Sequence, residues 1–145
     1  MAARTIRTII EGQELLWASG STHVSDAARM MKRRQVGAIT VVEAGKLVGI
    51  FTERDALFRV VAEGRDPTTT PIAEVMTPNP RTISPDKPFA SALHMMHEGR
   101  FRHVPVVDEN ERPIGMISAR DAMGPELEQF IYAALFDEQA RDVLA

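Results

Sequence analysis

The chain has 145 residues, of which 44% are hydrophobic and 26% are charged, as expected for one compact domain or two small units that share a core. Its 17 basic and 20 acidic residues give a net charge of -3, which argues against binding nucleic acid irrespective of sequence, because that needs a basic surface. The absence of cysteine excludes disulfides, thiolate catalysis and zinc sites with cysteine ligands.

Helix and strand patterns alternate through the first half of the chain. A helix is predicted from Val24, because apolar residues then recur at helical spacing. Strands are predicted in "GAITVVE" (37–43) and "LVGIFT" (47–52), which are rich in β-branched residues and flank the turn "AGK". A further helix is expected to begin at Thr52.

A proline-rich crossover, "AEGRDPTTTPIAEVMTPNP" (62–80), leads to the same series of elements in the second half. A helix is predicted from Phe89, strands in "HVPVVD" (103–108) and "PIGMIS" (113–118), and another helix from Ser118. After a Gly-Pro break, apolar residues at helical spacing predict a terminal helix in 125–145 that covers its own module or reaches a partner.

The two halves are an internal repeat. Val41 aligns with Val106 at an offset of 65 residues, and after one inserted residue Gly49 aligns with Gly115 at an offset of 66. The repeat ends in "GIFTERD" (49–55) and "GMISARD" (115–121), so a hydroxyl and an aspartate recur three residues apart. One such motif is explained by helix capping, but capping alone does not require the glycine, the hydroxyl, the arginine and the aspartate to recur together.

These motifs resemble the G-h-h-[ST]-x-x-D signature (h, apolar) of cystathionine-β-synthase (CBS) domains, which occur as tandem pairs. "TIRTII", "IAEVMTPNPRTISPD" and "RHVPVVD" fit the same family. The resemblance implies an α/β fold of two tandem βαββα repeats related by a pseudo-two-fold axis, plus the C-terminal helix. The expected boundaries are repeat one in 5–64, a crossover linker in 65–81, repeat two in 82–124 and the helix in 125–145.

The resemblance also implies two clefts that bind adenosine compounds such as AMP, ADP, ATP or S-adenosylmethionine. Asp55 and Asp121 would accept hydrogen bonds from the ribose diol, as acidic residues do in dinucleotide-binding folds. The hydroxyls of Thr52 and Ser118 would contact ribose or phosphate. Backbone groups near Thr82-Ile83 and near Ala18-Ser19 would contact adenine.

The two clefts are expected to be unequal. Arg102 and His103, at the start of the strand in the second repeat, would point basic groups at a phosphate of either cleft, although they could equally be solvated side chains. Their counterparts are Gly37 and Ala38, which cannot serve that role. We therefore expect the loss of Asp121 to weaken binding more than the loss of Asp55.

Neither a metal site nor catalysis is expected. His94 and His97 share a helix face near His103 in sequence, but they align with Arg29 and Lys32, which are solvent-facing types. No nucleophile–base pair and no glycine-rich phosphate loop is present in the sequence. We therefore expect a non-enzyme that has no cofactor beyond a regulatory nucleotide.

The predicted function is a sensor module that acts on an unidentified regulated protein. Apolar residues after the two motifs (Leu57, Phe58, Val61, Met123) predict a homodimer. The alternatives are a structural dimerisation module whose clefts stay empty and, disfavoured by charge, a weak nucleic-acid binder. No apolar run reaches the roughly 20 residues of a membrane helix and no signal-peptide core opens the chain, so we expect a cytoplasmic protein without membrane contact.

Overall fold

The computed structural model describes residues 4–122. The first half contains, in chain order, α1 (Ile6–Ile10), β1 (Trp17–Ala18), α2 (Val24–Arg34), β2 (Ala38–Glu43), β3 (Lys46–Thr52), α3 (Glu53–Asp55) and the π-helical segment η1 (Ala56–Val61). The second half contains the short helix η2 (Ile72–Glu74), β4 (Thr77–Pro78), α4 (Phe89–Gly99), β5 (His103–Val107), β6 (Pro113–Ser118) and the short helix η3 (Ala119–Asp121). The predicted helices and strands of both repeats are confirmed up to residue 122, and the predicted C-terminal helix lies outside the described residues.

The two long helices, α2 and α4, are built alike. Each begins at the predicted apolar residue and buries the face that carries its apolar spacing, including Ala27 in α2 and Ala92 in α4. Each ends on a residue with left-handed backbone, Gln35 (φ 53°) and Arg100 (φ 58°), which terminates the helix as an αL cap does. The counterparts again lie 65 residues apart.

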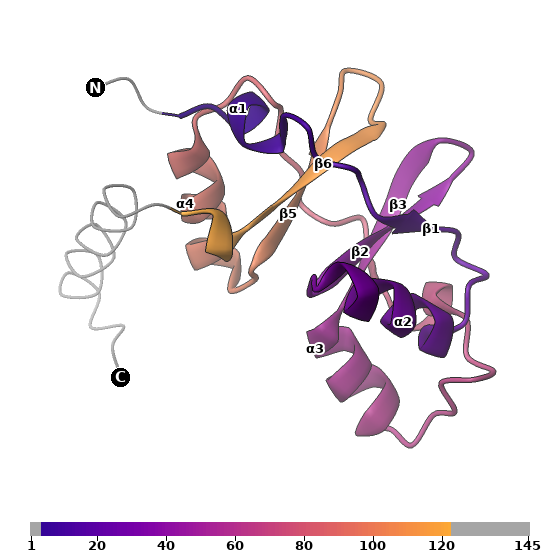
Figure 1. The fold of residues 1–145 in the computed structure, drawn as a ribbon. Coiled ribbons are helices and arrows are strands. Elements are labelled where there is room, and N and C mark those ends of the chain that lie inside the picture. The colour runs from indigo at the N-terminus through magenta and orange to yellow at the C-terminus, as the bar shows by residue number, and fades with distance from the viewer. Residues whose placement is uncertain (1–3, 123–145) are drawn as a thin grey trace, which may run out of the picture.

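The two sheets keep the repeat but differ in extent (Figure 1). In the first sheet the order is β1-β2-β3-β4, with β1 parallel to β2 and the other pairs antiparallel. The second sheet is the hairpin β5-β6, and a parallel bridge from Ile83 to Val106 repeats the pairing of Ala18 with Val41. Both hairpins shift register after the same valine, at Val41/Val42 and at Val106/Val107.

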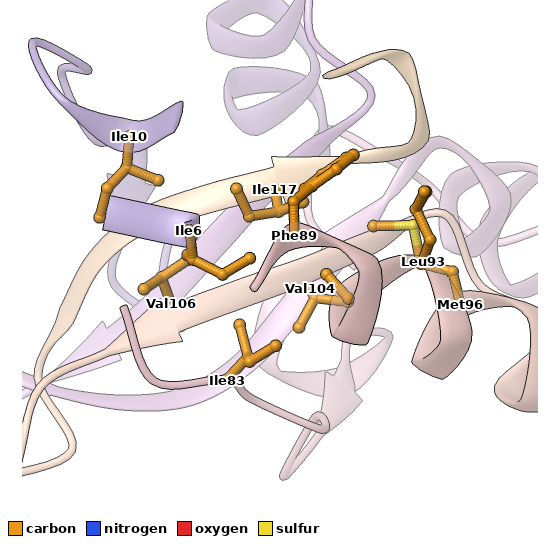
Figure 2. Close-up of a cluster of buried hydrophobic side chains, with 10 residues drawn as sticks. Ile6, Ile10, Ile83, Phe89, Leu93, Met96, Val104, Val106 and Ile117 are labelled. Carbon is orange, nitrogen blue, oxygen red and sulfur yellow. The ribbon is translucent and has the colours of Figure 1, made fainter. Parts of the chain in front are cut away.

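The two halves exchange short segments. α1, at the N-terminal end, lies against the second repeat, where Ile6 and Ile10 join the cluster of Phe89, Val104, Val106 and Ile117 (Figure 2). The crossover segment η2 lies against the first repeat, where Ile72 and Val75 join the cluster around Phe51. The boundaries predicted from sequence did not anticipate this exchange, because contacts between segments distant in sequence are not visible in a local pattern.

Backbone hydrogen bonds hold the exchanged segments in equivalent ways. The amide of Ile6 donates to the carbonyl of Lys87 at 2.9 Å, and the amide of Ile72 donates to the carbonyl of Thr22 at 2.8 Å. The side chain of Gln13 bonds both backbone groups of Met116 on β6, at 2.9 and 3.0 Å. Gln13 thereby takes the place that β4 takes beside β3 in the first repeat.

This exchange explains the glycine that opens each motif. A Cβ atom on Gly115 would lie 2.7 Å from Cγ2 of Ile10, and one on Gly49 would overlap the side chain of Met76. Each glycine therefore makes room for the segment that arrives from the other half. The recurrence of the glycine in the two motifs is a packing requirement.

Candidate functional site

The carboxylate of Asp55 is held at the junction of β3 and α3. Its Oδ2 accepts the backbone N–H of Thr52 at 3.0 Å, and the backbone N–H of Asp55 donates to the Thr52 hydroxyl at 3.1 Å. This reciprocal pair is a capping box with aspartate in place of the usual glutamate. The capping interpretation is therefore correct for this motif, and the binding interpretation depends on what else surrounds the carboxylate.

Asp55 is nearly buried, with 6% of its surface exposed, and two further groups reach it. The Thr77 hydroxyl on β4 donates to Oδ1 at 3.2 Å, and Nε of Arg59 lies 3.5 Å from the same oxygen. Thr77 comes from the crossover and Arg59 from η1, so three segments converge on one carboxylate. Neither group was predicted from the sequence.

The second motif is more open. Oδ2 of Asp121 accepts the backbone N–H of Ser118 at 2.8 Å, and the Ser118 hydroxyl lies 3.4 Å from the same atom. The guanidinium of Arg4 donates to the backbone carbonyl of Asp121 at 2.7 Å, so the exchanged N-terminal segment also contacts this motif. Asp121 is only partly buried.

A cavity of about 510 Å³ opens beside Asp55, between the first motif and the turn from α4 into β5. Four of the predicted site residues line it, namely Thr52, Asp55, Arg102 and His103. Apolar side chains form other parts of its wall, namely Ile50, Phe58, Pro80 and Phe101. Its volume lies in the range of small-molecule sites, about 300–1,000 Å³.

The charge of this cavity is opposite in sign to that of the whole chain. Five arginines line it together with only two carboxylates, Glu53 and Asp55. The arginines are Arg54, Arg59, Arg81, Arg100 and Arg102. Such a concentration of guanidinium groups favours an anion with several oxygen atoms, because each guanidinium can donate two parallel hydrogen bonds to it.

Two of these arginines are engaged by the protein itself. Arg54 lies over the ring of Phe58, 5.5 Å from its centroid, and Arg59 donates to the carbonyl of Met76 at 2.7 Å. Within residues 4–122, the guanidinium groups of Arg81, Arg100 and Arg102 make no hydrogen bond or ion pair. Those three are the groups most available to a ligand.

Two further hollows adjoin the cavity. One of about 400 Å³ lies beside Ser118 and Arg120, and shares Glu53, Arg102 and His103 with the cavity. The other is lined by Thr82 and Ile83 and adjoins the cavity at Asn79–Arg81. Thr82 and Ile83 therefore lie beside the Asp55 cleft.

The remaining predicted residues lie elsewhere. Asp121 is near the Ser118 hollow in sequence but does not line any of these three hollows. Ser19 does not line them either, and its hydroxyl bonds the hydroxyl of Ser21 at 2.8 Å. The structure thus gathers the predicted residues mainly at the first motif.

His103 lies in the wall between the cavity and the Ser118 hollow. Burial lowers the pKa of its imidazole below the ordinary value of 6.5, while the nearby carboxylate of Glu53 raises it and Arg102 lowers it further. The imidazole is therefore uncharged at neutral pH. It can act there as a hydrogen-bond donor or acceptor.

Sequence reasoning missed most of the arginines. Arg54 recurs as Arg120 in the repeated motif, but recurrence alone does not distinguish a ligand contact from a structural role. Arg100 is the residue that ends α4, and Arg81 lies in the crossover, so neither carries a sequence signal of its own. Their grouping depends on the packing of the two repeats.

Two further features concern metals and membranes. Within residues 4–122, no three histidine, aspartate or glutamate side chains gather closely enough to hold a metal ion. His94 pairs instead with Glu98, 2.9 Å away and one helical turn on. Across the same residues, no helix combines the length and apolar character needed to cross a bilayer.

Residues 10–62 and 72–124 each match the CBS domain family, so the chain belongs to that family and carries two CBS domains in tandem. The predicted family and the predicted fold of two α/β repeats are both confirmed.

Individual relatives are similar over most of this chain. It is 39% identical over 114 residues to the CBS domain-containing protein CBSCBSPB1 of Arabidopsis thaliana, covering 78% of this chain and 21% of that protein. It is 38% identical over 98 residues to the CBS domain-containing protein YhcV of Bacillus subtilis, covering 68% and 69%. The chain therefore spans only about a fifth of the Arabidopsis relative.

A solved structure adds information about ligands in the family. The CBS domain pair of protein MJ0100 is 26% identical, with a TM-score of 0.74 and coverage of 81% of this chain and 95% of that one. It was solved in complex with 5′-methylthioadenosine and S-adenosyl-L-methionine. Adenosine compounds are therefore ligands of a CBS pair with a similar fold.

Proposed function

We propose that this protein is a non-catalytic sensor module that binds an adenine nucleotide in the cavity beside Asp55. The observation that carries the proposal is the meeting of Thr52 and Asp55 with five arginines in one cavity of about 510 Å³. The ligands of the MJ0100 pair support the adenosine part of the proposal.

Each part of a nucleotide has a counterpart in the cavity. The Asp55 carboxylate accepts the two ribose hydroxyls, which displace the contacts of 3.2 and 3.5 Å from Thr77 and Arg59. The phosphates accept hydrogen bonds from the guanidinium groups of Arg81, Arg100 and Arg102, which form no ion pair within residues 4–122. The base lies on the apolar wall, which includes Phe101.

The charge of the cavity narrows the choice of ligand. A sulfonium cation gains nothing from five arginines, whereas a phosphate gains from each guanidinium that reaches it. We therefore propose AMP, ADP or ATP in preference to S-adenosylmethionine. The nucleotide is a regulatory ligand and is not transformed.

Isothermal titration calorimetry with AMP, ATP and S-adenosylmethionine tests this proposal. We expect the two nucleotides to bind at least roughly tenfold more tightly than S-adenosylmethionine, the effect of one charge-assisted hydrogen bond. If no adenine nucleotide binds at millimolar concentration, the sensor proposal is wrong. If S-adenosylmethionine binds most tightly, the assignment of the arginines to phosphate is wrong.

A second candidate function, a dimerisation module, rests on a different surface. Leu57, Phe58 and Val61 on α3–η1 are 54%, 53% and 69% exposed, a large apolar area for one helical segment. We propose that this segment contacts a second copy of the chain. A homodimer is compatible with nucleotide binding, and a dimer with no nucleotide affinity would favour the purely structural role.

A further inference from the structure

The Asp55 cavity and the Ser118 hollow are separated by a wall of three side chains that face both. These are Glu53, Arg102 and His103. Each side of the wall is anchored by a backbone hydrogen bond within its own repeat, from the amide of Glu53 to the carbonyl of Gly37 and from the amide of Ala119 to the carbonyl of Arg102, both 3.0 Å long. The Asp55 cavity and the Ser118 hollow therefore share a single guanidinium, that of Arg102, on the side where they adjoin.

The internal repeat breaks down at this wall. The counterparts of Arg102 and His103 are Gly37 and Ala38, and the counterpart of Glu53 is Ala119. A symmetrical pair would offer two copies of each of these three side chains, one for each space. This chain offers only one.

Steric contacts also explain why repeat one has a glycine, Gly37, at the position that aligns with Arg102. A Cβ atom on Gly37 would lie 3.1 Å from the carboxyl group of Glu53 and 3.2 Å from the ring of His103. A larger residue at this position would force both side chains to shift. The small residue in repeat one is thus complementary to the large ones in repeat two.

We propose that the two spaces are alternative sites for one nucleotide, so that a phosphate bound in either space excludes a second nucleotide from the other. This inference rests on the proposed function. Arg102 has no ion-pair partner within residues 4–122 and can turn to one phosphate at a time. Once it has turned to a phosphate in the Asp55 cavity, the Ser118 hollow keeps Lys32 and Arg120 but loses this guanidinium, and it faces Glu53 and the bound phosphate, which both repel a second phosphate.

Two matched charge reversals separate the spaces. Arg81 lines the Asp55 cavity but not the Ser118 hollow, and Lys32 lines the Ser118 hollow but not the cavity. Both are exposed, so Arg81→Glu and Lys32→Glu change the charge equally with little effect on packing. Far-ultraviolet circular dichroism and thermal melting of each variant check that the fold is kept.

Calorimetric titration with ATP in magnesium-free buffer measures the number of sites per chain. We expect one site in the wild type, one in Lys32→Glu, one weaker site in Arg81→Glu, and none in the double variant. Arg102→Ala should weaken ATP binding roughly tenfold in both single-variant backgrounds, because the same guanidinium serves both spaces.

Each other outcome overturns the proposal. Two sites per wild-type chain would show that the spaces fill independently, while leaving the proposed function intact. Complete loss of binding in Arg81→Glu would show that the Ser118 hollow is not a site. An effect of Arg102→Ala in only one background would show that the wall is not shared. No binding to the wild type would overturn the proposed function itself.

Discussion

The two aspartates of the repeated motif differ in their surroundings although their motifs are alike. Asp55 is 6% exposed, accepts hydrogen bonds from Thr52 and Thr77, and pairs with Arg59. Asp121 is partly buried and accepts hydrogen bonds from Ser118. Only Asp55 lines the arginine-rich cavity. A motif therefore specifies the cap, and the residues around it specify whether the carboxylate faces a ligand.

The ranking of the two aspartates expected from sequence should therefore be reversed. We expect Asp55→Ala to weaken nucleotide binding by roughly 5- to 150-fold, because the ribose donors and the half-buried Thr77 hydroxyl lose their acceptor. It should also lower the unfolding free energy by about 1–3 kcal/mol through loss of the cap.

Asp121→Ala is the matched control for this change. It removes a cap of the same type at the counterpart position and should reduce nucleotide affinity less than Asp55→Ala does. Calorimetry gives the affinities and urea unfolding gives the stabilities. A larger loss of affinity in Asp121→Ala would favour the ranking expected from the sequence, and an equal loss would contradict both rankings.

His103 should make the stability of the fold depend on pH. Its pKa is lower in the fold than the ordinary 6.5, because burial outweighs Glu53 and Asp121, while Arg102 and Arg120 oppose the charged ring. Between these two pKa values the unfolded chain binds more protons, so stability is fully present above pH 6.5 and decreases as the pH falls below it.

Urea unfolding at a series of pH values from about 5 to 8, the range in which most proteins are stable, measures this dependence. His103→Gln, which cannot titrate, should flatten the decrease below pH 6.5, and His94→Gln, an exposed histidine on α4, should not. The contribution assigned to His103 is absent if both variants follow the wild-type curve.

At the scale of the elements, the exchange of α1 and η2 links the two halves. Each half completes its core with a segment from the other part of the chain, Ile6 in one case and Ile72 in the other. Both isoleucines are fully buried. The two repeats are therefore expected to fold as one cooperative unit, although each has its own hairpin.

Ile6→Ala and Ile72→Ala test the exchange as a matched pair. Each should lower the unfolding free energy by about 2–5 kcal/mol, the usual effect of removing a buried isoleucine side chain. Hydrogen exchange should first accelerate in β5–β6 for Ile6→Ala and in β2–β3 for Ile72→Ala. Faster exchange in β2–β3 for Ile6→Ala, or in β5–β6 for Ile72→Ala, would contradict the exchanged arrangement.

At the scale of the whole molecule, the apolar surface of η1 predicts self-association. Leu57→Glu combined with Val61→Glu places two charges on it and should convert a dimer to a monomer, as measured by light scattering at micromolar concentration. Trp17→Glu is the control, because Trp17 is equally exposed at 54% but lies on β1. A wild-type monomer, or dissociation by Trp17→Glu alone, would count against this interface.

The sequence by itself determined the repeat, the two long helices, the two hairpins and the family, but not the short elements α1, β1, η2 and β4. The long helices and the hairpins follow from local spacing: apolar residues of α2 and α4 recur with the helical period, and the strands are short β-branched runs between turns. The sequence also indicated four residues of the site. Thr52 and Asp55 belong to the repeated motif, and Arg102 and His103 stand out because repeat one has Gly37 and Ala38 at the aligned positions.

Only the tertiary structure decided which of these residues share a site. Asp55 and Arg102 are 47 positions apart, and nothing local to either one places Arg102 on the same cavity. Arg81 and Arg100 are exposed residues in a loop and at a helix end, so no periodicity marks them. Packing of one repeat against the other brings them together, because a binding site depends on contacts between distant segments.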